Sequence, residues 1–191
     1  YGKVRKMISY QYSKKVLKKN IIKIKDENIK SINSLNRVVA SNISCGINYP
    51  TGDNAAFDGY AINSQDTKNI KKSLSKKFKI IGLIAAGNKP FKKKIKRYDA
   101  VEIMTGGIIP KGFDTIIPIE QIIFYPNESN KKYILINKKI KKHNHVRFAG
   151  SDFKKKEIVV KKNTIIQPNH ILAFKTLGIK NIKVKKKVNI L

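Results

Sequence analysis

Two aspartates, Asp53 and Asp58, lie in a part of the chain that contains no basic residue. The 30 residues from Val38 to Thr67 hold neither lysine nor arginine, although 42 of the 191 residues are basic. Carboxylates in such a setting can hold a divalent metal, position water or transfer a proton. Gly59 follows Asp58 and lets a backbone approach a ligand closely. We expect Asp58 to be catalytic and Gly59 to bind the ligand, although an aspartate before glycine can also simply form an Asx turn.

A second stretch, residues 98–130, contains a single basic residue. Within it, Thr105, Gly106 and Gly107 offer a hydroxyl and consecutive backbone N–H groups, a type of turn that can cradle an oxyanion. Glu120 follows an apolar run and offers another carboxylate. We expect Thr105 and Glu120 to be catalytic and the two glycines to bind the ligand. The alternative is structural, with Thr105 bonded to a neighbouring carbonyl and Glu120 paired with a lysine.

Asp152 is the fourth catalytic candidate, and its alternative role is that of an ordinary turn residue. Its neighbours include Gly150 and Ser151, which are common in turns. No metal-binding set is evident, because the three histidines have no ligand spacing with Cys45, the only cysteine. The ligands of any metal ion therefore stay unassigned, and Cys45 is expected to be a small core residue.

Local patterns predict a mainly β middle section between mixed flanks. Apolar spacing after Ser9 predicts a helix with Tyr12, Val16 and Leu17 on one face. A second helix that runs into an extended stretch is predicted over 32–39, and a third opens at Pro168 and ends at Gly178. Short runs rich in branched residues predict strands at 21–25, 79–86, 100–104, 114–124, 133–140, 157–160, 164–166 and 180–184.

The net charge of +30 suggests a polyanion partner, but its composition argues against specific nucleic-acid recognition. Only four of the 42 basic residues are arginine, the side chain that binds phosphate bidentately. The excess of lysine is what an AT-rich coding bias would produce, and the runs 92–94 and 154–156 are interpreted as solvated turns. No apolar run approaches 18 residues, so we expect a cytoplasmic protein without a membrane partner.

Four segments in this order resemble the N-terminal region of the molybdopterin molybdenumtransferase family, which includes the C-terminal part of gephyrin: 53–61, 86–107, 110–120 and 146–152. The family's Pro-x-x-Asp-Asn-Ser-Ala-Met-Asp-Gly-Tyr-Ala is similar to Pro50–Ala61, with Ala55 for serine and Phe57 for methionine. Its Ile-Met-Thr-Gly-Ala is similar to Ile103–Gly107. Its Arg-x-x-Gly-Glu-Asp is similar to residues 147–152, with Ser151 in place of glutamate.

The resemblance implies an enzyme that inserts molybdate into adenylylated molybdopterin and releases AMP, with Mg²⁺ as cofactor. It implies an α+β fold in which a discontinuous mixed domain, 7–48 with 148–186, is interrupted by a β-rich domain, 49–147. We expect residues 187–191 to begin a third, pterin-binding domain that is missing here, so that this fragment alone would be inactive. The resemblance also implies a homodimer.

Two alternatives stay open. The chain could be a non-catalytic dimer scaffold of the same family, for which Ser151 is the indication. It could also be a basic module that binds polyanions or RNA, but its tyrosines and phenylalanines show no clustering of the kind that stacks bases.

Overall fold

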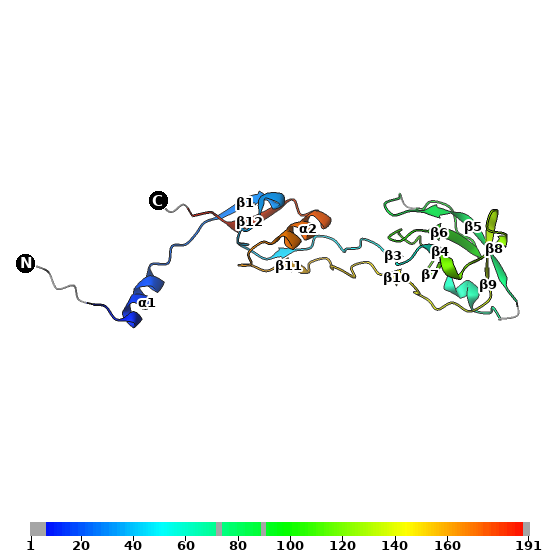
Figure 1. Ribbon diagram of the computed structural model, residues 1–191, viewed down its shortest axis with the longest axis horizontal. Helices are drawn as coiled ribbons and strands as arrows, with labels where there is room; N and C mark the ends of the chain where they lie inside the picture. Colours follow the sequence, from blue (N-terminus) through cyan, green and yellow to red (C-terminus); the bar gives the residue numbers. More distant parts are fainter. Residues whose placement is uncertain (1–6, 72–73, 89–90, 189–191) are drawn as a thin grey trace, which may run out of the picture. The chain divides into compact units, whose positions relative to one another are not determined.

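The computed structural model describes residues 7–71, 74–88 and 91–188 (Figure 1). Within the described residues, the chain forms two compact units, one combining residues 7–43 with 158–188, the other lying within Ser44–Glu157. The borders lie at 43/44 and 157/158, whereas the sequence suggested 48/49 and 147/148. Residues 45–49 pair with residues 153–157, so both segments belong to the same unit. For example, the Cys45 N–H donates to the Glu157 carbonyl at 2.8 Å.

The first unit carries both described α-helices. Its elements are α1 (Tyr10–Lys19), β1 (Asp26–Lys30), the 3-10 helix η1 (Ser31–Asn33), β2 (Ile43–Ser44, at the border), β11 (Ile158–Val160), α2 (Pro168–Thr176) and β12 (Asn181–Lys185). β1 pairs antiparallel with β12, and β2 pairs with β11. α2 contributes the fully buried Phe174 to a core that also contains Val39, Ile166 and Val184. Neither described helix is long and apolar enough to cross a membrane.

The second unit is built on one six-stranded sheet. Its strands are β4 (Gly59–Ile62), β5 (Lys76–Ile84), β6 (Asp99–Ile103), β7 (Thr115–Pro118), β8 (Ile123–Pro126) and β9 (Lys131–Ile136), in the spatial order β7-β4-β6-β5-β9-β8. Only the β5–β6 pair is parallel among these strands. The 3-10 helices η2 (Ser64–Thr67) and η3 (Ile119–Gln121) follow β4 and β7, and a short pair joins β3 (Asn54–Ala55) to β10 (Val146–Arg147).

Both faces of this sheet are covered by apolar side chains. Tyr60, Phe78 and Ile134 belong to one buried cluster, and Val101 and Ile116 belong to the other. Because side chains alternate along a strand, β4 and β6 contribute to both clusters. The result is an α+β protein whose inserted unit is β-rich, as the sequence predicted.

Three local predictions are wrong and one is incomplete. The strand expected at 164–166 is reduced to an isolated bridge between Ile165 and Val38. The helix expected over 32–39 is limited to η1, because Val38 and Val39 bridge instead to Ile165 and Val184. The strand expected at 21–25 lies later, as β1, where it pairs with β12. The run 114–124 is divided into β7, η3 and β8. In each case pairing between distant segments decides the backbone conformation, and a local pattern does not contain that information.

Candidate active site

Asp58 and Thr105 meet at one end of the sheet. Asp58 directly precedes β4 and Thr105 follows the end of β6, and these strands are antiparallel neighbours with Gly59 opposite Ile103. The Asp58 Oδ1 accepts two hydrogen bonds from Thr105, one from the backbone N–H and one from the side-chain hydroxyl, each at 2.7 Å. Two motifs that are far apart in the sequence therefore form one polar contact, and both residues are exposed to solvent.

These two hydrogen bonds lower the pKa of the Asp58 carboxyl below its ordinary value of 3.8. The backbone N–H of Thr105 has the larger effect and its hydroxyl the next, because both stabilise the charged form. Asp58 is therefore a carboxylate at neutral pH. As such it can accept a proton, orient water or hold a cation, but it cannot act as a general acid.

Gly59 is required by the packing of the sheet. A Cβ atom at this position would lie 2.0 Å from the Ile117 carbonyl oxygen in β7. Gly59 is buried, and it lies between Ile103 of β6 and Pro118 of β7 in the sheet register. From the sequence we expect the missing side chain of Gly59 to admit a ligand, whereas in the structure the backbone of β7 occupies the space that a Cβ atom would take.

The turn after β6 uses its amide groups within the protein. The N–H of Thr105 donates to Asp58 at 2.7 Å, that of Gly106 to the Ala55 carbonyl at 2.9 Å, and that of Gly107 to the Met104 carbonyl at 2.8 Å. Gly106 has a positive φ of 80°, which explains the choice of glycine there. All three N–H groups are therefore already hydrogen-bonded within the protein, and none is free to bind the expected oxyanion. The Thr105 side chain is the exposed polar group of this turn.

Glu120 lies in the segment that contacts Asp58. The Ile119 N–H donates to the Asp58 backbone carbonyl at 3.0 Å, and Glu120 follows in η3 as an exposed side chain. The sequence did not indicate this contact, because it depends on the pairing of β4 with β7. The fold thus brings Asp58, Thr105 and Glu120 to one end of the sheet.

Asp152 belongs to a different cluster. Its carboxylate forms an ion pair with Arg147, and its N–H donates to the Tyr49 carbonyl at 3.1 Å. The Ser151 hydroxyl lies 3.3 Å from the Asp152 Oδ1, and the carboxylate raises the pKa of Arg147. Asp53 supports the same loop by accepting the Ala149 N–H at 2.9 Å. This cluster is attached to Asp53 and not to Asp58.

The described residues contain no group of three or more His, Cys, Asp and Glu side chains that could hold a metal ion. His145 packs against Phe57 with ring centroids 5.0 Å apart, and His143 packs against Phe148 at 5.1 Å. Asp58 and Glu120 remain as the carboxylates of the site. Two carboxylates suit Mg²⁺ that arrives with a phosphate-bearing ligand, because this ion keeps several waters and takes few protein ligands.

Comparisons with known proteins agree with this architecture. The family model described as "MoeA N-terminal region (domain I and II)" matches residues 8–178. The molybdopterin molybdenumtransferase of Staphylococcus aureus is 31% identical over 157 residues, which are 82% of this chain and 36% of that protein. The enzyme of the same name from Haemophilus influenzae is 33% identical over 155 residues, 81% of this chain and 36% of that one.

A solved structure is similar over the same region. The molybdopterin biosynthesis moeA protein from Pyrococcus horikoshii superposes with a TM-score of 0.79 at 30% identity, covering 94% of this chain and 46% of that one. The fold thus defines the class of α+β proteins to which this solved structure belongs. The chain belongs to the family of the MoeA N-terminal region, and it spans about 36% of the length of the curated relatives cited above.

Proposed function

We propose that this chain supplies one wall of the active site of a molybdenumtransferase, which inserts molybdate into adenylylated molybdopterin and releases AMP. The observation that carries the proposal is the double hydrogen bond from Thr105 to Asp58. It joins two of the motifs that carry the resemblance to the family, and it favours the charged form of an exposed carboxylate. Family membership and the names of the relatives support the reaction type.

In this proposal Asp58 and Glu120 act on an anionic substrate without direct contact to its phosphate. A carboxylate and a phosphate repel each other, so a bound cation or a water molecule must lie between them. Mg²⁺ held by Asp58 and Glu120 would neutralise the phosphoanhydride and polarise its phosphorus. Thr105 keeps the Asp58 carboxylate oriented, and Asp152 shapes the separate Arg147 loop.

The proposal includes a homodimer in the cytoplasm, in which the pterin is bound by a domain outside these 191 residues. It includes neither a membrane partner nor specific recognition of nucleic acid. The low proportion of arginine supports the second point, although lysine excess gives any such protein a salt-sensitive affinity for polyanions.

A reconstitution tests the proposed reaction. The chain is mixed with a separately expressed C-terminal part of the Haemophilus influenzae relative, adenylylated molybdopterin, Mg²⁺ and molybdate, and AMP release is followed by chromatography. We expect AMP only when both pieces are present. Asp58→Asn keeps the shape and an acceptor for Thr105 but removes the charge, and we expect a loss of about a hundredfold or more in rate.

The matched control is Glu128→Gln, which removes one negative charge from an exposed position in the β8–β9 turn and should leave the rate unchanged. If the two pieces associate and no AMP appears, the chain is a scaffold without transferase activity, and Ser151 becomes the residue to restore to glutamate. An Asp58→Asn rate equal to that of Glu128→Gln would assign Asp58 a structural role only.

A further inference from the structure

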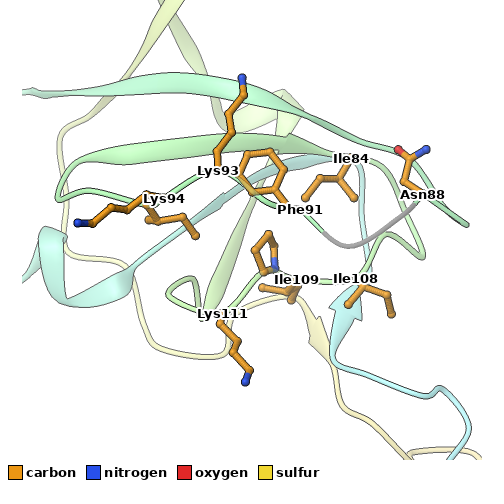
Figure 2. Close-up of a pocket in the computed structure, with 10 residues that line it drawn as sticks. Ile84, Asn88, Phe91, Lys93, Lys94, Ile108, Ile109 and Lys111 are labelled. Atoms are coloured by element: carbon orange, nitrogen blue, oxygen red, sulfur yellow. The ribbon is translucent and has the colours of Figure 1, made fainter.

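The second unit contains a cavity of about 530 Å³ that the proposed reaction does not use. It lies between the end of β5, residues 91–95 and residues 108–111 (Figure 2). Its volume is in the range of roughly 300–1,000 Å³ that is typical of small-molecule sites. The lining is mainly apolar with a basic rim, and it consists of Ile84, Asn88, Phe91, Lys93, Lys94, Ile95, Ile108, Ile109, Pro110 and Lys111.

The walls of this cavity are fixed by contacts to the sheet. Phe91 lies against β5 at Gly82, where a Cβ atom would be only 3.0 Å from the ring carbon Cε2. The Lys93 Nζ donates to the Ile81 carbonyl at 2.6 Å, which anchors the same segment. Phe91, Ile95 and Ile109 pack against the buried cluster of Val101 and Ile116. The apolar floor is therefore preformed.

The charges around the floor have one sign. Lys93, Lys94 and Lys111 are part of the lining, and its described residues include no aspartate or glutamate. Figure 2 shows the ammonium groups of Lys94 and Lys111 directed outward, with Phe91 and Ile84 facing Ile108 and Ile109 across the cavity; the Lys93 ammonium group is held by the Ile81 carbonyl. A ligand that satisfies both features has a flat apolar body for the floor and a negative group at its edge for the rim.

We infer that this cavity is a binding site for a planar aromatic anion. The aromatic face of Phe91 and the opposing isoleucines would enclose the ring, as expected for an apolar pocket with few polar groups. Lys94 and Lys111 would hold the anionic group at the rim. The inference rests on the cavity alone and is independent of the proposed transferase activity.

The test uses 2-naphthalenesulfonate as probe, titrated into the full chain by calorimetry. Neutral 2-naphthol supplies the ring without the charge, and inorganic sulfate supplies the charge without the ring. We expect saturable binding of 2-naphthalenesulfonate to a single site, at least about tenfold tighter than either partial probe. Equal affinity for 2-naphthol, or binding that does not saturate, would overturn the inference.

Variants locate the binding. Ile108→Trp fills the cavity from a half-exposed position. It should weaken the binding of 2-naphthalenesulfonate about tenfold or more. The double variant Lys94→Gln with Lys111→Gln should weaken the same binding several-fold. The matched double variant Lys139→Gln with Lys142→Gln removes two exposed charges from another part of the same unit. It should leave affinity unchanged. The same loss in both double variants would mean nonspecific charge attraction and refute the site, even if Ile108→Trp fails to fold.

Discussion

Gly59→Ala tests whether the packing of β4 against β7, and not a ligand, explains the glycine of the Asp58 motif. The new Cβ atom would lie 2.0 Å from the Ile117 carbonyl oxygen, 2.9 Å from the carbonyl carbon and 3.0 Å from the Pro118 Cα. Contacts below 3.0 Å are essentially never seen for a Cβ. All three obstacles are backbone atoms of a paired strand, so no side chain can rotate away to relieve them.

The expected loss of stability in Gly59→Ala is large because the clash cannot be relieved by a side-chain movement. Overpacking a well-packed region typically costs about 1–3 kcal/mol. Because β4 must move away from β7 while it stays paired with β6, we expect about 3 kcal/mol or more. With a urea dependence of about 1–3 kcal/mol per molar for a domain of this size, the unfolding midpoint should fall by about 1–3 M.

Urea unfolding followed by circular dichroism measures the midpoint, and hydrogen exchange identifies which strands lose protection. Gly46→Ala is the control in the same unit, because a Cβ there meets no heavy atom within 4 Å. It should change stability by about 0.5 kcal/mol or less. A Gly59→Ala midpoint equal to that of Gly46→Ala would refute the packing argument and return Gly59 to a ligand-binding role.

Three further changes test other contacts. Thr105→Val removes the hydroxyl but keeps the N–H bond, so the pKa of Asp58 should rise part of the way toward 3.8, as carboxyl NMR titration would detect. The pKa of Asp58 is lower in the folded than in the unfolded chain, so its stability contribution is present above pH 3.8 and is lost as the pH falls through the folded pKa. Thr105→Val should reduce this loss of stability in acid. An unchanged Asp58 titration would contradict the role of the hydroxyl. Asp114→Ala removes the acceptor of the Ser64 N–H at 2.7 Å and hydroxyl at 2.9 Å, and should cost about 1–3 kcal/mol in urea unfolding, whereas a neutral result would mean that water replaces the carboxylate. Phe174→Ala empties the core of the first unit and should cost about 3–5 kcal/mol, and a thermal midpoint unchanged from wild type would show that α2 does not stabilise that unit.

The two α-helices were predictable because their signals are local. Ser9 caps α1 by accepting the Tyr12 N–H at 3.2 Å, and Tyr10–Lys19 follows the predicted apolar spacing. Pro168 opens α2, and Gly178, with a φ of 68°, follows its end. Capping and spacing act within a few residues, so the amino-acid order contains nearly all the information needed.

The candidate site was predictable only in its residue types. The absence of lysine and arginine around Asp58 and Thr105 singled out both segments, but their contact depends on β4 and β6 being neighbours. The same holds for Glu120, whose segment reaches Asp58 through the pairing of β4 with β7. Local sequence patterns do not show which strands become neighbours, because strand pairing depends on contacts between residues far apart in the chain.

What the sequence determined by itself is therefore the family, the α+β class, the helices α1 and α2, and the segments of the candidate site. The tertiary structure decided the roles within those segments. The backbone of β7 fills the space beside Gly59, and the N–H groups of Gly106 and Gly107 donate to backbone carbonyls of the same unit. The tertiary structure also placed Lys93, interpreted from the sequence as part of a solvated turn, at the rim of a cavity. The physical reason is that helix signals act between near neighbours in the chain, whereas strand contacts and cavities arise between residues that only the completed fold brings together.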